Sequence, residues 1–188
     1  MKKIIIFNGS PRKHGGVSQI LNRLQDGANE AGAQVKVYDL NQAAIKGCQG
    51  CMYCKTKKVA KCCLNDYLQP MYEDIQAADV IVVGSPIYMF HVSAQVQTWI
   101  NRLFPFVDLQ HNPLAGGKKL ITVYSQGSGS PNAFKSAMDY FEGIMKIMDW
   151  KEVERIINTD CLPAVLPAKV SEEILNKAYE IGKFINDR

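Results

Sequence analysis

The sequence predicts an α/β fold in which a parallel sheet of five strands lies between two layers of helices. Short apolar runs alternate along the chain with segments whose apolar residues recur at helical spacing. Strands separated by helices in this way run parallel, and their crossover helices cover both faces of the sheet. The third apolar run is continuous, as is typical of a strand buried on both faces. The expected strands are residues 3–7, 35–40, 80–84, 119–124 and 153–157.

Capping residues locate the helices between these strands. Gly32 follows the first helical segment, where a glycine ends helices in a left-handed conformation. Ser93, Asn132 and Ser171 each stand at the start of a helical segment, where a side-chain oxygen can accept a backbone N–H. The expected helices are residues 18–31, 68–77, 93–103, 132–148 and 171–186.

Composition indicates one globular domain. The chain has 188 residues, of which 47% are hydrophobic and 21% charged, and a net charge of +4. That mild charge does not call for a nucleic-acid partner, and no apolar run is long enough to span a bilayer. Only four apolar residues follow Met1-Lys2-Lys3, too few for a signal peptide. We therefore expect a single domain over residues 1–188 in the cytoplasm, with a cysteine-rich insert at about 47–63.

The first loop has the composition of a phosphate site. Residues 8–18 (NGSPRKHGGVS) connect the first strand to the first helix. A helix N-terminus there supplies backbone N–H groups and a positive dipole, and Ser10, Arg12 and Ser18 add polar side chains. The loop lacks a Walker lysine, the glycine spacing of a dinucleotide fingerprint, and the cysteine nucleophile of a phosphatase. The alternative is a glycine-rich turn that binds nothing.

Two further loops leave the same edge of the predicted sheet. Residues 84–90 (GSPIYMF) form a small apolar and aromatic segment, and residues 124–130 (YSQGSGS) are rich in glycine and serine. A flat ring could lie against the first, with loop N–H groups at its polar edge. Alternatively, Tyr88 and Phe90 are core aromatic residues. Three such loops at one edge favour a shared ligand.

These motifs resemble those of a known family. GSPR at residues 9–12, GSPIY at 84–88 and TWINRLF at 98–104 are similar to the flavodoxin-like NAD(P)H-dependent FMN reductases. The resemblance implies a doubly wound sheet with strand order 2-1-3-4-5 and FMN as cofactor. Two departures are Gly16-Val17, where the family commonly has Asn-Thr, and Asn101, where it commonly has Asp.

The resemblance also assigns cofactor contacts. It implies that the first loop binds the FMN phosphate, the second carries the isoalloxazine ring, and the third closes over the pyrimidine end. The corresponding residues are Ser10, Arg12, Val17 and Ser18; Pro86, Ile87, Tyr88 and Met89; and Gln126 and Gly127.

The insert carries closely spaced cysteines. Cys48, Cys51, Cys54 and Cys62 follow the pattern C-x2-C-x2-C-x7-C, and Cys63 comes next. Compact spacing of this kind suits an iron–sulfur cluster, here a 4Fe-4S cluster, and resembles the iron–sulfur flavoprotein branch of the family. The alternatives are a zinc site, a redox dithiol at the C-x-x-C pair of Cys48 and Cys51, and free thiols.

The expected activity is therefore that of an oxidoreductase. The resemblance implies that a nicotinamide, NADH or NADPH, delivers hydride to FMN, and that the electrons pass to a small molecule or protein acceptor. The alternative is an electron carrier of the iron–sulfur flavoprotein type, which serves protein partners. Relatives commonly form homodimers, and we expect a homodimer here, with Phe104, Pro105 and Phe106 near the interface.

Overall fold

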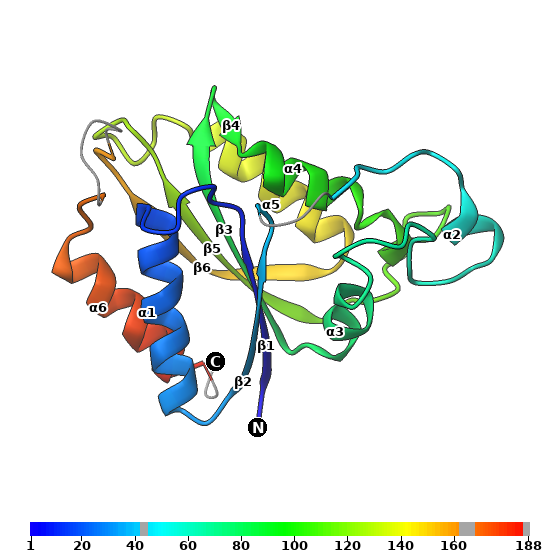
Figure 1. Ribbon diagram of the computed structural model, residues 1–188, viewed down its shortest axis with the longest axis horizontal. Coiled ribbons are helices and arrows are strands. Elements are labelled where there is room, and N and C mark those ends of the chain that lie inside the picture. Colours follow the sequence, from blue (N-terminus) through cyan, green and yellow to red (C-terminus); the bar gives the residue numbers. More distant parts are fainter. Residues whose placement is uncertain (42–44, 162–167, 186–188) are drawn as a thin grey trace.

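The computed structural model describes residues 1–41, 45–161 and 168–185. Its central sheet lies between two layers of helices (Figure 1), as the sequence predicts. Five strands run parallel in the order β2-β1-β3-β5-β6, which confirms the expected 2-1-3-4-5 order for the parallel strands. Their bounds are β1 Lys3–Asn8, β2 Gln34–Asp39, β3 Val80–Tyr88, β5 Lys118–Ser125 and β6 Trp150–Asn158.

A sixth strand corrects the expected count of five. β4 (His91–Val92) pairs antiparallel with the end of β3, so that Tyr88 lies opposite His91. The expectation also ended the third strand at Gly84, whereas β3 continues through the second loop to Tyr88. The reason is the hairpin: pairing with β4 keeps residues beyond the sheet edge extended.

The helices divide between the two faces of the sheet (Figure 1). On one face, α1 and α6 cover an apolar cluster that includes Ile4, Ile6 and Val82. On the other, α3, α4 and α5 cover a cluster that includes Phe7 and Trp99. Alternate residues of the strands enter opposite clusters, as the pleat requires. The bounds are α1 Gly16–Glu30, α3 Met71–Ala77, α4 Ala94–Asn101, α5 Lys135–Ile147 and α6 Glu172–Lys183.

The contact between α1 and α6 depends on two glycines. A Cβ atom on Gly27 would lie 2.1 Å from the carbonyl oxygen of Tyr179, and one on Gly182 would lie 2.1 Å from that of Leu24. The two helix backbones therefore approach more closely than any side chain would allow. This contact fixes α1, whose first turn lies at the first loop.

Most expected helix ends are confirmed. Gly32 has a φ of +74°, and the Ser93 and Ser171 hydroxyls accept N–H groups of the first turns of α4 and α6. Asn132 is not a cap: its carbonyl accepts from Lys135 N–H, and α5 begins only at Lys135.

Other boundaries shift by a few residues. α1 begins at Gly16 rather than residue 18, and α4 ends at Asn101, where the short 3-10 helix η1 (Phe104–Phe106) follows. The expected end of the last helix, residue 186, lies outside the described residues. The insert contains one short helix, α2 (Tyr53–Thr56), which projects beyond the ends of α3 and α4 (Figure 1). None of the described helices is long and apolar enough to cross a membrane.

Candidate functional site

The first loop is organised by Asn8, at the end of β1. Its side-chain oxygen accepts the N–H of Ser10 at 3.0 Å, and its amide nitrogen donates to Ser18 Oγ at 3.0 Å. Ser18 Oγ in turn donates to the carbonyl of Arg12 at 2.9 Å. An asparagine in this position makes an Asx turn, which bends the chain directly after the strand. The Ser18 hydroxyl therefore holds the loop in shape.

The Ser10 hydroxyl has a similar role. Its oxygen accepts the N–H of Arg12 at 3.2 Å and lies 3.2 Å from the Arg12 carbonyl, to which it donates. Both predicted hydroxyl ligands are thus buried and engaged within the loop.

The groups that the loop leaves for an anion are backbone N–H groups and one guanidinium. The N–H groups of Gly16, Val17 and Ser18 stand in the first turn of α1, where a helix has no carbonyl partner for them. The Arg12 side chain is partly exposed, and none of the described carboxylates pairs with it. Together they form a site suited to a phosphate group. We call residues 12–18 the anion seat.

The first and second loops are joined by hydrogen bonds. The N–H of Gly9 donates to the carbonyl of Gly84 at 2.8 Å, and Ser93 Oγ donates to the carbonyl of Gly9 at 2.8 Å. Ser93 N–H also donates to Ser85 Oγ at 2.9 Å. A Cβ on Gly9 would lie 2.1 Å from a Val96 methyl, so only glycine permits this close approach. The cap of α4 thereby sets the position of both loops.

Replacing Ser93 with alanine tests this joint. Ser93→Ala removes the helix cap and leaves the buried Gly9 carbonyl without its donor, so stability should fall by about 1–2 kcal/mol. The affinity for FMN should also fall, because the loops lose their common anchor. Thermal unfolding and flavin titration measure the two effects. Ser171→Ala is the matched control: it removes only the cap of α6 and should lower stability with little change in flavin affinity.

The second loop is a tight hairpin with a strained tip. Met89 and Phe90, between β3 and β4, have φ angles of +45° and +64°, a conformation that residues with a Cβ adopt at an energetic cost. Their side chains are 91% and 74% exposed. Strain of this kind is concentrated at functional sites. Pro86 and Ile87 are buried below the tip, and Tyr88 is 43% exposed beside it.

The third loop lies against the start of α1 and the end of β6. The N–H of Gln126 donates to the carbonyl of Asn158 at 2.9 Å. A Cβ on Gly16 would lie 2.7 Å from Asn158 Nδ2 and 2.9 Å from Ser125 Oγ, so the anion seat touches both strands. The Gln126 side chain is buried and donates to the carbonyl of Ser130 at 2.6 Å.

The structure brings all three predicted loops to one edge of the sheet. Gly127 is exposed next to Gln126, whose Oε1 is buried without a partner among the described residues. A buried acceptor of this kind indicates a missing donor. This acceptor and the N–H groups of the anion seat suit FMN, which carries both a phosphate and ring N–H groups.

The sequence reasoning missed four positioning residues of this site. They hold the loops by hydrogen bonds or close contact and would not themselves be chosen as ligands. The sequence did carry a signal for Asn8, since an asparagine directly before Gly-Ser at a strand end is typical of an Asx turn. The others depend on tertiary contacts between distant segments. The residues are Asn8, Ser85, Ser93 (taken only as a cap) and Asn158.

The cysteine insert is fastened to the body by two buried cations. Arg102 donates to the carbonyl of Lys46 at 2.9 Å and pairs with the carboxylate of Asp66, so one guanidinium holds both ends of the insert. Lys55 donates to the carbonyl of Phe104 at 2.6 Å and to that of Val107. Burial lowers the pKa of Lys55.

The five thiols of the insert border one small cavity. Cys51 Sγ lies 3.6 Å from the sulfur of Cys63, the one cysteine of the insert outside the C-x2-C-x2-C-x7-C spacing. The pKa of Cys51 is lowered, first by the backbone N–H of Tyr53, whereas burial raises that of Cys54. Among the described residues, no three of His, Cys, Asp and Glu come together closely enough to hold a metal ion. Thiols around one cavity are the donors that an iron–sulfur cluster uses, so the predicted cluster stays a prediction.

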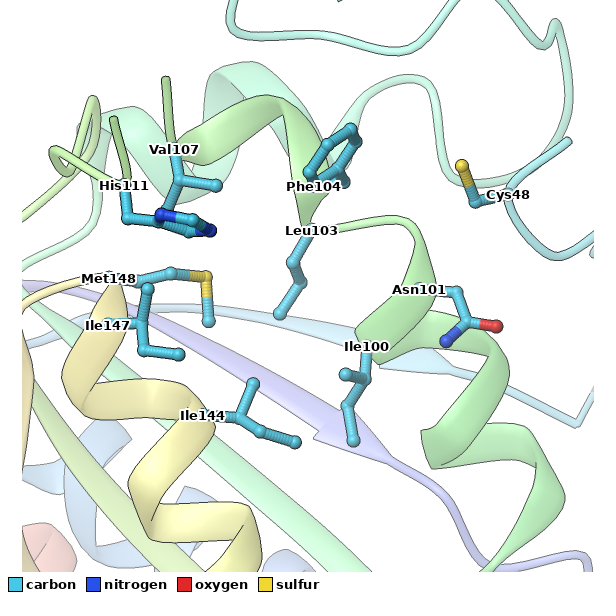
Figure 2. A pocket seen from close by; sticks show the side chains of 10 residues that line it. All are labelled: Cys48, Ile100, Asn101, Leu103, Phe104, Val107, His111, Ile144, Ile147 and Met148. Atoms are coloured by element: carbon cyan, nitrogen blue, oxygen red, sulfur yellow. The ribbon is translucent and has the colours of Figure 1, made fainter. Parts of the chain in front are cut away.

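An apolar pocket of about 370 Å³ lies at the opposite ends of α4 and α5 from the three loops (Figure 2). Figure 2 shows Ile100 and Ile144 facing each other across it, with the His111 ring beside Met148. Phe104, which the sequence places near a dimer interface, is also part of its wall. The pocket offers few polar groups, so it is not suited to a phosphorylated cofactor.

Known proteins share this architecture. A flavodoxin from the domain Archaea superposes on it with a TM-score of 0.59 at 14% identity over 98% of this chain and 96% of the other. The NAD(P)H:quinone oxidoreductase of Methanothermobacter marburgensis has a TM-score of 0.73 at 17% identity, over 98% of this chain and 97% of that one. These likenesses define the class: a flavodoxin-like α/β protein.

The family follows from sequence. The model of the NADPH-dependent FMN reductase family matches residues 2–160, and the chain belongs to that family. It is therefore an oxidoreductase and a flavoprotein, with FMN as its cofactor. An iron–sulfur flavoprotein of Archaeoglobus fulgidus is 29% identical over 187 residues, which cover 98% of this chain and 79% of that protein. The FMN-dependent NADH:quinone oxidoreductase of Rhizobium meliloti is 38% identical over 82 residues, 40% of each chain.

Proposed function

We propose that this protein is an FMN-dependent NAD(P)H oxidoreductase that reduces a quinone, a nitro compound, a flavin or a similar acceptor. The observation that carries the proposal is the anion seat, joined to two further loops at one sheet edge. FMN supplies the chemistry, accepting hydride from the nicotinamide and passing electrons on. The chain supplies binding and orientation.

Each loop has a separate task in this proposal. The N–H groups of Gly16, Val17 and Ser18 and the Arg12 guanidinium bind the phosphate, while Ser10 and Ser18 hold the loop through their hydroxyls. The segment from Pro86 to Met89 forms one wall for the ring, since it combines a buried base with an exposed apolar tip. No side chain is needed as a general acid or base, because hydride transfer requires none from the protein.

The third loop binds the polar end of the ring. The buried Oε1 of Gln126 accepts a ring N–H, and Gly127 leaves space for close approach. In this role Gln126 keeps its own N–H donation to Ser130, while the third loop opens enough to expose the buried Oε1 to the ring.

Anaerobic reduction of the bound flavin tests the proposal. NADPH or NADH, added alone to the FMN-loaded protein, should bleach the visible flavin bands within the time of a stopped-flow experiment, and a quinone should restore them. Comparing the two nucleotides identifies the preferred donor. If both leave the flavin oxidised while a ferredoxin-like donor reduces it, the protein is a carrier and the reductase proposal fails.

The second candidate is an electron carrier with a 4Fe-4S cluster at Cys48, Cys51, Cys54 and Cys62. Relatives named iron–sulfur flavoproteins support it. The net charge of +4 argues against it, because carriers commonly present an acidic face. An absorbance spectrum of anaerobically purified protein tests this candidate: flavin bands alone would overturn it, and an added broad brown shoulder would support it.

A homodimer in the cytoplasm completes the proposal. Ile147 is 48% and Phe104 is 37% exposed at the apolar pocket of Figure 2. Exposed apolar surface of this kind is costly in water and favours association with a second copy. Sedimentation at working concentration measures the state directly.

A further inference from the structure

The positive charge of the chain is concentrated in the cysteine insert. Of the 22 lysine and arginine residues, four lie within residues 47–63, a segment with no aspartate or glutamate. The 18 that remain balance the 18 acidic residues, so the insert accounts for the whole net charge of +4. A local field of one sign attracts partners of the opposite sign. The four residues are Lys55, Lys57, Lys58 and Lys61.

Lys55 is buried and holds the insert in place, whereas the other three lysines are exposed. Lys55 donates to the carbonyls of Phe104 and Val107, and it thereby joins α2 to the segment around η1. None of the described carboxylates forms an ion pair with the three exposed lysines. Their ammonium groups are therefore available to the carboxylates of another molecule.

A groove of about 400 Å³ lies between the insert and the segment that follows η1. Lys58 lines it from the insert, and Leu109 and Leu114 line it from the other side. The two leucine side chains are 60% and 48% exposed. Large apolar side chains that are exposed beside a hollow are typical of interaction surfaces. The groove therefore offers an apolar wall and a basic wall to the same ligand.

Hydrogen bonds fix the wall that carries the leucines. The Asp108 carboxylate accepts the N–H groups of Gln110 and Asn112 at 2.8 Å each, and the side-chain amide of Asn112 at 2.7 Å. The N–H of Leu114 donates to the carbonyl of Phe106 at 2.7 Å. The one acidic group of the groove is thus engaged within its own loop. A surface formed before binding loses little conformational entropy when a partner arrives.

We propose that this groove and the three exposed lysines form a docking surface for an acidic segment of a partner protein. An apolar side chain of that segment packs against Leu109 and Leu114 in the groove, and neighbouring carboxylates pair with the lysines. The surface lies at the end of α4 opposite the three flavin loops (Figure 1), so the inference goes beyond the proposed function.

Two other occupants of a basic surface fit these observations less well. A lipid surface is flat, whereas the apolar side chains here line a hollow. Recognition of anionic lipids commonly uses about four to eight basic residues, and three are exposed here. Nucleic acid would use the lysines for its phosphates but would leave the leucines without a partner.

Fluorescence anisotropy of a labelled peptide tests the inference on the full FMN-loaded chain. The peptide Glu-Glu-Leu-Glu-Glu-Leu-Glu-Glu should bind saturably, and its affinity should fall severalfold between about 50 and 300 mM salt. Replacing Lys57, Lys58 and Lys61 together with glutamine should weaken binding about tenfold, through the loss of three exposed ion pairs. Leu109→Ser should also weaken it about tenfold, because the leucine of the peptide loses its apolar contact.

A matched variant controls for net charge. Replacing Lys3, Lys151 and Lys177 with glutamine removes the same charge from exposed positions outside the insert and should change the affinity by less than about twofold. The inference is overturned if the peptide does not bind saturably, or if this control weakens binding as much as the insert variant does. It is also overturned if the insert lysines bind phosphatidylserine vesicles but not the peptide. Reduction of FMN by the nicotinamide should be unchanged in every variant, so a failure of docking leaves the reductase proposal intact.

Discussion

Arg12→Ala protein should bind FMN about 10- to 100-fold more weakly than the wild type. The guanidinium stands at the anion seat without a carboxylate partner among the described residues, and charge-assisted hydrogen bonds to a phosphate contribute about 1.5–3 kcal/mol. Riboflavin lacks the phosphate, so its affinity should change by no more than about twofold. Quenching of flavin fluorescence during titration measures both constants.

Two variants accompany this measurement. Arg12→Lys keeps the charge but loses the forked donor set, so it should recover only part of the FMN affinity. Lys13→Ala removes an exposed neighbouring charge and should have a small, salt-dependent effect. If Arg12→Ala weakens FMN and riboflavin equally, Arg12 acts on loop structure and is not a phosphate ligand.

Gly27→Ala should lower the free energy of unfolding by about 3 kcal/mol. The added methyl would lie 2.1 Å from the carbonyl oxygen of Tyr179, and because this atom belongs to the α6 backbone, the two helices must separate. For a chain of this length the thermal midpoint should fall by roughly 6–12 °C. Differential scanning calorimetry measures the shift.

Gly143→Ala is the control for Gly27→Ala. Gly143 also lies inside a helix, α5, but it is exposed and a Cβ there would meet no atom within 4 Å. Alanine should therefore raise stability by about 0.5–1 kcal/mol, which is its ordinary helix advantage over glycine. Equal behaviour of the two variants would contradict the close packing of α1 on α6.

Local rules were sufficient to predict the sheet and the location of the site. Alternation of strands and helices determines a parallel sheet, and loops after parallel strands must share an edge. The caps at Ser93 and Ser171 follow from the same local chemistry, since a hydroxyl before a helical segment has one obvious acceptor role. The predicted cap at Asn132 was wrong, because turn residues surround it and α5 begins only at Lys135.

Contacts between distant segments could not be predicted. The Ser93 hydroxyl was expected only to cap a helix, but the fold also brings it to the carbonyl of Gly9, 84 residues earlier in the chain. The hairpin between β3 and β4 was missed because Met-Phe is not a turn sequence; Asn-Gly is typical there.

The left-handed pair at the hairpin tip has a consequence for engineering. Asn-Gly at positions 89 and 90 would relieve backbone strain of about 1–2 kcal/mol per residue, so a screen for heat resistance would select it. The same exchange would delete the exposed thioether and phenyl group at the tip of the loop that we propose to hold the flavin ring. A substitution that raises thermal stability at these two positions should therefore lower activity. Stabilising substitutions should be sought elsewhere in the chain.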